Sequence, residues 1–311
     1  QAAGTLGGLD GADALCAERA TAAGLPGNYV ALLSNATTDA IDRIGAARGW
    51  VRPDGLPFLL DGPFEAPLYL PRLDETGTEI PGSLALLLTA TDRDGMYDGQ
   101  DCGDFQVLSN SLVRGGYIDH GGVAWFNFLT TTCSVTATRL LCMQTDSQKT
   151  LQAPVPPAPF RYAFAREDQY VPGPGGVSAA DALCQMEAES LGVATGRTYI
   201  AMLGTSTASA LSRFDLSGPN WYSLDGVPLV STPADIANGR WNTAIGTQNF
   251  GTATGGPFDA TVALTDNCEN WTEEDGTHLA GRSLAGGEQV YQQSTRAGCS
   301  NSFKALLCFE E

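Results

Sequence analysis

Short apolar runs separated by glycine, proline and aspartate dominate the hydrophobic pattern of this chain, and such runs predict short β-strands. The predicted internal strands lie at residues 29–33, 83–89, 199–203 and 261–264. Two further runs, at residues 139–143 and 304–309, are apolar almost throughout, which is typical of buried strands. The pattern therefore predicts short strands as the main element of the fold.

Helical periodicity marks two longer segments. One follows Asp10 and runs to Gly24, and the other follows Ser178 and runs to Gly192. Asp and Ser are good N-caps and Gly is a common helix stop, so we expect the helices to start directly after Asp10 and Ser178. Two short helices are also predicted, at residues 38–44 and 208–214.

The cysteines reveal an internal duplication. The eight cysteines are Cys16, Cys102, Cys133, Cys142, Cys184, Cys268, Cys299 and Cys308. Successive spacings are 86, 31 and 9 residues in the first four and 84, 31 and 9 in the second four, which indicates a tandem repeat. A proline-rich segment lies between the copies and is expected to be extended and stiff. The predicted domains are residues 1–152 and 160–311, with residues 153–159 as the linker.

Other residues follow the same repeat. The string Ala-Asp-Ala-Leu precedes both Cys16 and Cys184. Trp50 of the first copy corresponds to Trp221 of the second, and each is followed by an Asp-Gly-x-Pro turn. Because these two tryptophans occupy matched positions, we expect them in the core rather than on a ligand-binding surface.

Charge and composition limit the partners. The 17 Lys and Arg residues stand against 35 Asp and Glu residues, and the formal net charge of −18 repels phosphate backbones and anionic surfaces. Nucleic acid and heparin-like partners are therefore not expected. No run of apolar residues is long enough to span a bilayer, so no membrane insertion is expected. Residue 1 is Gln, and we expect the sequence to be a processed or trimmed product.

The cysteine pattern favours disulfides over a metal site. Each copy has an even number of cysteines, there is no Cys-x-x-Cys motif, and His120 and His278 are the two histidines of the chain. Four cysteines per copy allow three pairings, and spacing alone does not choose among them. Disulfides persist in oxidising compartments, so we expect a secreted or surface-displayed protein.

Several segments together resemble a known family. In the first copy, residues 24–34 after the first helix read Gly-Leu-Pro-Gly-x-Tyr-x-Ala-x-Leu-Ser. The second copy has Cys-x-x-Trp from Cys268 and ends in a Cys-x8-Cys segment that closes at Cys308. These features resemble endostatin, the C-terminal domain of certain collagens and a variant of the C-type lectin-like fold. The resemblance covers both copies and leaves loops at residues 58–82 and 227–258 unmatched.

The resemblance implies an α+β fold with two tandem C-type lectin-like (endostatin-like) modules. Each module would combine short, mostly antiparallel strands with one or two helices and two nested disulfides. The implied pairs are Cys16–Cys142 around Cys102–Cys133, and Cys184–Cys308 around Cys268–Cys299. The sugar-binding and calcium-binding tripeptides of the wider family, the zinc-binding histidines of endostatin and its arginine cluster do not occur here. The resemblance therefore carries a fold but none of those activities.

An acidic segment of the first copy offers candidate metal ligands. Five aspartates lie close together and are interrupted by glycines that permit tight turns: Asp92, Asp94, Asp98, Asp101 and Asp104. Calcium takes about six to eight oxygen ligands, so these carboxylates are a candidate calcium site. The alternative is a solvated loop of Asx turns ahead of a disulfide. The second copy retains only Asp266 and Asn267 there, so such a site would belong to the first copy alone.

The sequence does not indicate catalysis. Asp119 and His120 could form half of a catalytic pair, but no serine nucleophile motif lies near them, and the second copy has Gly286 at the position of His120. We therefore expect that the protein is not an enzyme.

One difference between the copies concerns their first strand. Residues 160–171 precede the helix of the second copy and are strand-like, whereas the first copy begins at Gln1 and has no counterpart. In lectin-like folds an opening strand of this kind pairs with the terminal strand, so residues 139–143 are expected to present an unpaired edge that another chain can extend. Two alternatives stay open: upstream residues were removed, or a loop covers the edge.

These observations predict a secreted or surface-displayed, non-catalytic binding or adhesion protein. It would recognise an extracellular glycan, protein or surface through its long loops, and two modules would add avidity. The alternative is a structural subunit of an extracellular matrix or filament, whose copies assemble by strand exchange at the open edge of the first module.

Overall fold

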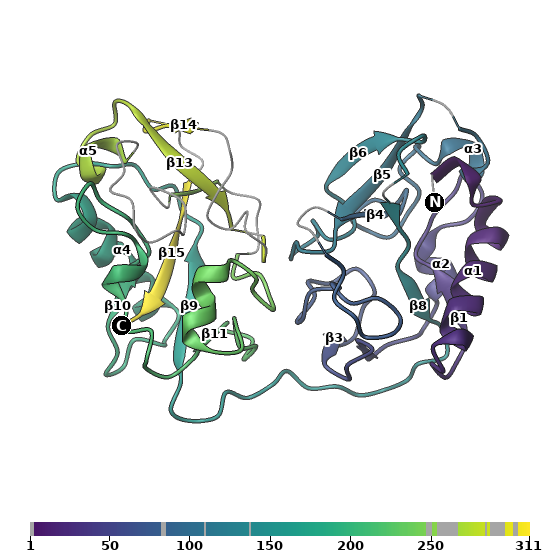
Figure 1. The fold of residues 1–311 in the computed structure, drawn as a ribbon, viewed down its shortest axis with the longest axis horizontal. Helices are drawn as coiled ribbons and strands as arrows, with labels where there is room; N and C mark the ends of the chain where they lie inside the picture. Colours follow the sequence, from purple (N-terminus) through teal and green to yellow (C-terminus); the bar gives the residue numbers. More distant parts are fainter. Residues whose placement is uncertain are drawn as a thin grey trace. The chain divides into compact units, whose positions relative to one another are not determined.

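A computed structural model describes residues 3–81, 85–108, 110–136, 138–246, 251–253, 267–283, 285–286, 296–300 and 304–311. The chain forms two compact units, unit 1 (Gln1–Ala153) and unit 2 (Pro154–Glu311), shown in Figure 1. The fold is α+β, with small mixed sheets, few helices and four disulfides.

Unit 1 contains several separate small sheets. Its described elements are η1 (Ala3–Thr5), α1 (Gly8–Ala22), β1 (Tyr29–Ala31), α2 (Ala40–Ile44), β2 (Trp50–Val51), β3 (Pro57–Leu59), β4 (Leu86–Leu88), α3 (Cys102–Phe105), β5 (Leu112–Tyr117), β6 (Leu129–Thr132), β7 (Thr138–Arg139) and β8 (Cys142–Gln144). Strand β1 pairs with β8, β2 pairs with β3, and a four-stranded sheet has the order β6-β5-β4-β7. All these pairs are antiparallel except β4 with β7.

Unit 2 contains one larger sheet. Its described elements are β9 (Arg161–Arg166), α4 (Gly176–Ser190), β10 (Tyr199–Ala201), η2 (Leu211–Arg213), β11 (Trp221–Tyr222), η3 (Pro233–Asn238), β12 (Gly251–Ala253), α5 (Cys268–Trp271), β13 (Thr277–Arg282), β14 (Arg296–Gly298) and β15 (Lys304–Glu310). The seven strands have the order β11-β9-β15-β12-β13-β14, and β10 pairs with β15. Strand β9 thus joins β11 to the rest of the sheet.

The long helices start earlier than the sequence predicts. Both begin at a glycine, Gly8 in α1 and Gly176 in α4, so Asp10 and Ser178 lie inside the helices and the predicted N-caps are wrong. The preceding residues, Gly7 and Gly175, have φ of 78° and 102°, a left-handed conformation that glycine adopts without steric cost. This glycine turn leads the chain directly into the helix, so no side-chain cap is needed.

A half-buried aspartate ties each long helix to its neighbouring strand. In unit 1 the carboxylate of Asp13 accepts a hydrogen bond from the Ala31 N–H (2.9 Å) and forms an ion pair with Arg43. In unit 2 the carboxylate of Asp181 accepts the Ala201 N–H (2.9 Å) and pairs with Arg213 (2.6 Å). The same network in both units shows that the sequence repeat is a structural repeat.

The predicted short elements are present in shortened form. Helix α2 covers part of residues 38–44, η2 covers part of residues 208–214, and β4 covers part of residues 83–89. Residues 261–264 lie outside the described residues.

The disulfides are nested within each unit. The pairs are Cys16–Cys142 and Cys102–Cys133 in unit 1, and Cys184–Cys308 and Cys268–Cys299 in unit 2. This is the pairing that the family resemblance implies. The outer bond connects the long helix to the last strand of its unit.

A left-handed turn follows the second cysteine of each unit. In α3 the residues Cys102 to Phe105 have φ between 54° and 60°, and α5 repeats this from Cys268 to Trp271 with φ between 51° and 67°. Consecutive left-handed residues other than glycine cost about 1–2 kcal/mol each. The inner disulfide and the fully buried Phe105 and Trp271 side chains hold this turn in place.

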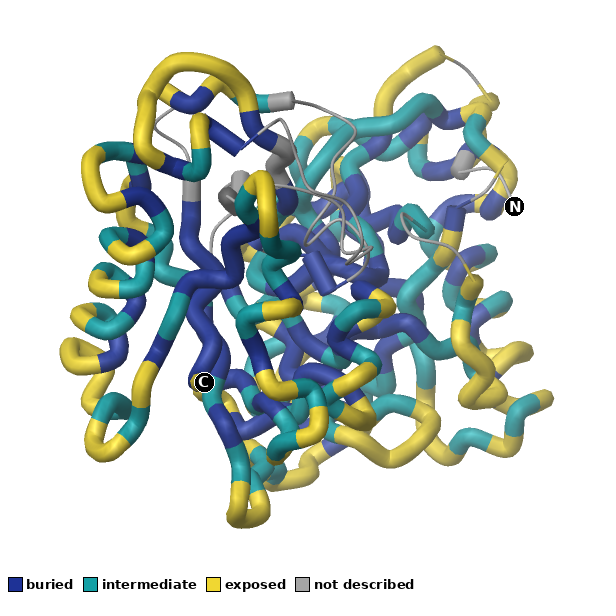
Figure 2. The backbone as a smooth tube through the Cα atoms, turned by 60° about the vertical axis from the view of Figure 1, so that its left-hand side comes forward, coloured by how far each residue is buried: buried dark blue, intermediate teal, exposed yellow. Residues whose placement is uncertain are grey.

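Each unit has one core cluster around its disulfides and another around its tryptophans. Trp50 is 5% exposed and Trp221 is fully buried, so the prediction that both belong to the core is confirmed. In Figure 2 the chain leading to the C-terminus is dark blue, because residues 305–310 of β15 are buried.

The last strand differs between the units. In unit 2, β15 is continuous and pairs with β9, β10 and β12. In unit 1 the corresponding stretch is split: β7 pairs with β4, β8 pairs with β1, and Leu140 and Leu141 between them belong to no strand. Unit 1 lacks a counterpart of β9 among its described strands, and this missing partner explains the split.

Candidate functional site

The outer edge of β8 has no strand partner in the described part of the chain. The bonds Leu32 N–H to Leu141 O (2.8 Å) and Thr145 N–H to Asn28 O (2.8 Å) fix the hydrogen-bonded pairs of the β1–β8 ladder. In an antiparallel ladder these pairs alternate with pairs whose N–H and C=O point outward. The backbone groups of Cys142 therefore point away from β1, toward the open edge.

Burial along the last strand shows the effect of this open edge. In unit 2, residues Leu306, Leu307, Cys308 and Phe309 are all fully buried. In unit 1, the matched residues Leu140, Leu141 and Cys142 are only half-buried, and Met143 alone is buried. The two strands have similar apolar sequences, so the difference comes from the absence of a covering strand among the described residues of unit 1.

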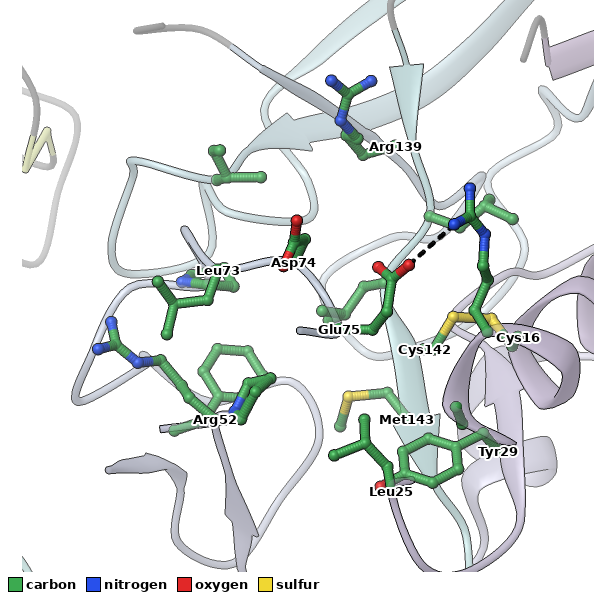
Figure 3. A pocket seen from close by; sticks show the side chains of 18 of the residues that line it. Cys16, Leu25, Tyr29, Arg52, Leu73, Asp74, Glu75, Arg139, Cys142 and Met143 are labelled. Atoms are coloured by element: carbon green, nitrogen blue, oxygen red, sulfur yellow. Dashed lines mark hydrogen bonds and ion pairs between the residues drawn. A yellow bond between two sulfur atoms is a disulfide. The ribbon is translucent and has the colours of Figure 1, made fainter. Parts of the chain in front are cut away.

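A groove of about 720 Å³ runs along this edge, and we call it the β8 groove. Residues 138–144 form one wall, and the lining includes Cys16, Arg19 and Ala20 of α1, Tyr29 of β1, Trp50 and Val51 of β2, and residues of the loop at 71–81. Figure 3 shows the Cys16–Cys142 disulfide, Met143 and Tyr29 at one side and Arg52 and Leu73 at the other. The volume lies within the range of about 300–1,000 Å³ that is common for binding cavities.

Hydrogen bonds hold the groove walls in place. The Trp50 Nε1–H donates to the carbonyl oxygen of Gln144 (2.8 Å), just as the Trp221 Nε1–H donates to that of Glu310 (2.9 Å).

Burial raises the pKa of Tyr29 above its ordinary value, and the charge of Asp146 raises it further. The Tyr29 hydroxyl therefore stays neutral, which suits an apolar wall.

The loop at residues 71–81, which we call the strap, reaches across the groove. Its turn is built on Asp74, whose carboxylate accepts the Thr76 hydroxyl (2.7 Å) and the Thr78 N–H (2.9 Å). Glu75 forms an ion pair with Arg19 of α1 (3.0 Å), drawn as a dashed line in Figure 3. No strand pairing links the strap to β8 in the described chain, so the strap crosses the groove without satisfying the open edge.

Asp92, Asp98 and Asp104, three of the candidate calcium ligands, are bonded to other protein groups. Asp92 accepts the N–H groups of two following residues, Asp98 pairs with Arg114 (2.7 Å), and Asp104 accepts the side-chain amide of Asn35 (2.6 Å). In the described part of the chain, no three carboxylate side chains each place an oxygen within 4.8 Å of the others. The structure therefore does not bring the five aspartates together as one ligand set.

Two other polar clusters are buried. Asp119 and His120 form a pair (Oδ1 to Nδ1, 2.9 Å), but among the described residues the His120 Nε2 has no hydrogen-bond partner, so no described nucleophile is bonded to this histidine. Cys268, His278 and Cys299 lie within 4.8 Å of one another, but the two sulfurs form a disulfide and are not free to bind a metal.

The sequence analysis located the open edge but not the groove around it. It did not identify Arg19, Ala20 or Glu75. The repeat contains a signal for two of them, because aligning the long helices places Arg19 opposite Glu187 and Ala20 opposite Ala188. Glu75 lies in a loop without a counterpart, so only the tertiary structure shows where it lies.

In comparisons with known proteins, no family model and no curated protein matches the chain. Within the described residues, no helix is long and apolar enough to cross a membrane. Four disulfides are typical of proteins that mature outside the cytosol.

Proposed function

We propose that this chain is an extracellular, non-catalytic binding protein whose unit 1 accepts an extended strand of a partner polypeptide in the β8 groove. The observation that carries the proposal is the half-burial of Leu140 to Cys142, where unit 2 buries Leu306 to Cys308 completely under β9. Adding a strand to an open sheet edge gives affinity through backbone hydrogen bonds and specificity through side-chain pockets.

The broader proposal retains the two endostatin-like, C-type lectin-like modules. The nested disulfides, the helix before the first strand and the repeated Cys-x-x-aromatic turn support it. Glycan or surface recognition through the long loops remains part of this proposal, but the groove favours a polypeptide ligand.

Peptide selection on the full chain tests the proposal. A library of random peptides is selected for binding to the wild-type chain and counter-selected on Ala20→Phe, which fills the groove from α1. We expect strand-forming peptides that bind the wild type at least about tenfold more tightly than the variant and slow amide exchange at Cys142. If no selected peptide depends on the groove, the proposal is wrong.

The same open edge supports a second candidate, a matrix or filament subunit whose copies exchange strands. An exposed strand edge is a template for pairing with further chains. Electron microscopy and size-exclusion chromatography distinguish the two candidates, because only the second gives ordered polymers without added ligand.

A further inference from the structure

In unit 2 a strand of the chain itself, β9, occupies the position beside β15 that corresponds to the β8 groove. Its side chains indicate which residues a strand bound in the β8 groove would carry. Strand β9 runs antiparallel to β15, with Phe164 opposite Cys308 and Arg166 opposite Leu306. It also runs parallel to β11, with Tyr162 opposite Tyr222. A strand in the β8 groove would lie in the same way between β8 and β2.

The central contact of β9 is made by Phe164. Its side chain is 2% exposed, lies 5.4 Å from the Tyr199 ring and belongs to the same core cluster as Ala188 and the Cys184–Cys308 disulfide. Each of these neighbours has a counterpart that lines the β8 groove, namely Tyr29, Ala20, Cys16 and Cys142. The groove therefore contains a subsite for an aromatic side chain next to the outer disulfide of unit 1.

The residues beside Phe164 are small. Ala163 is fully buried against the tryptophan cluster of unit 2, and Ala165 is packed against the same cluster. In unit 1 the corresponding side is already filled by Trp50, Leu87 and Ile118, which line the groove. A strand bound in the groove therefore needs small residues on both sides of its aromatic residue, so that its backbone can lie close to these three side chains.

The charge at one end of the slot is reversed between the units. In unit 2 the guanidinium of Arg166 lies 3.8 Å from the carboxylate of Glu187 on α4. The matched residue on α1 is Arg19, and Arg139 of the groove wall corresponds to Ala305. A partner residue at the place of Arg166 therefore meets positive charge, and an acidic side chain suits it.

Glu75 of the strap now fills this acidic position. Its ion pair with Arg19 is exposed, since the Arg19 side chain is 62% accessible, and such pairs contribute only about 0–1 kcal/mol. A carboxylate from the partner can replace Glu75 at little cost.

We propose that the strand accepted by unit 1 carries an aromatic residue between two small residues, with an acidic residue two positions after the aromatic one. It runs antiparallel to β8 in the register of β9 and belongs to a separate polypeptide. This inference rests on the proposed function.

Strand β9 of a second copy is a poor occupant for two reasons. It would place Arg166 next to Arg19, and like charges repel. Removing β9 from its own unit 2 would also expose the edge of β15 for each β8 edge that is covered, so no net apolar surface would be buried.

Donor-strand fusions of the full chain test the inference. The segment Tyr-Ala-Phe-Ala-Glu is fused to the N-terminus through a Gly/Ser linker of about 20 residues, which gives a millimolar effective concentration. Matched fusions carry Tyr-Ala-Phe-Ala-Arg or Tyr-Ala-Ala-Ala-Glu. Amide exchange at Leu140 and Cys142 is measured for each fusion.

We expect the Glu fusion to slow this exchange about three- to tenfold more than the Arg fusion, and the fusion without Phe to give no protection. In an Arg19→Glu background the order of the Glu and Arg fusions should invert. Glu75→Gln should strengthen protection by the Glu fusion, whereas the control Asp168→Asn, which breaks an exposed ion pair of unit 2, should not.

Three outcomes separate this inference from the proposed function. Equal protection by the Glu and Arg fusions, or protection without Phe, overturns the sequence preference but leaves strand binding intact. Absence of protection by every fusion, while peptide selection yields groove-dependent strands of another pattern, overturns the inference alone. Failure of both experiments overturns the proposed function as well.

Discussion

Units 1 and 2 share a helix, a nested pair of disulfides and an Asp–Arg network, yet their last strands have different surroundings. In unit 2, β9 pairs with both β15 and β11 and unites seven strands in one sheet. In unit 1 the corresponding strands form two two-stranded sheets and one four-stranded sheet, and a groove lies beside β8. The presence of this one strand therefore distinguishes the continuous sheet of unit 2 from the open edge of unit 1.

The largest expected effect comes from the outer disulfides. Cys16–Cys142 and Cys184–Cys308 close loops of similar length, with separations of 126 and 124 residues, so loop entropy assigns about 5 kcal/mol to each. Each pair is replaced by alanine in turn, and hydrogen exchange monitors denaturation of each unit. Loss of Cys16–Cys142 should release β8 from unit 1, whereas loss of Cys184–Cys308 should leave β15 held by its neighbours. Equal local exchange in both last strands would contradict the role assigned to β9.

The next effect concerns the aromatic residue that fills the slot in unit 2. Phe164→Ala should destabilise unit 2 by about 3–5 kcal/mol, because it removes a buried aromatic side chain and leaves a cavity. It should also speed amide exchange along β15, so that this strand approaches the behaviour of β8. Phe160→Ala, at a half-buried position of the same segment, is the control and should cost less.

A matched pair of substitutions on the long helices measures the empty space directly. Ala188→Phe should destabilise unit 2 by about 1–3 kcal/mol, because it overpacks a filled core. Ala20→Phe points into the β8 groove and should change the stability of unit 1 by less than about 1 kcal/mol. Thermal unfolding of the two variants measures these changes in stability. An equal loss of stability in both would show that the β8 groove has no room for an additional aromatic side chain.

The smallest effect concerns the strap. The hydroxyl of Thr76 and the N–H groups of Thr78 and Thr76 donate to Asp74 and hold its pKa below the ordinary 3.8. A lowered pKa stabilises the turn above pH 3.8, and this contribution disappears as the pH falls through the lower folded value. We expect the strap turn to loosen only below pH 3.8, and an NMR titration of the Asp74 carboxyl measures this.

Asp215 of unit 2 is the internal reference for that titration. The hydroxyl and N–H of Ser217 likewise lower its pKa, so both carboxyls should titrate below 3.8. An Asp74 value at or above 3.8 would show that the turn, and with it the position of Glu75, is not fixed by these bonds.

Much of the architecture could be predicted from local sequence. The cysteine spacing revealed the repeat, and the matched tryptophans indicated core positions. The helix starts were missed because a left-handed glycine turn replaced the side-chain cap, and the glycine pairs at residues 7–8 and 175–176 are the sequence signal for that turn. The aspartates at residues 92–104 looked like one ligand set because sequence shows proximity along the chain, whereas in the structure Asp92, Asp98 and Asp104 each bond to different protein groups.

The sequence by itself determined the duplication and the disulfide chemistry, because both are matters of residue identity and spacing. Only the tertiary structure decided that the open edge of β8 borders a groove and that Glu75 reaches Arg19 across it. Those features depend on where a loop without a repeat counterpart packs, and that is set by contacts between residues far apart in the chain.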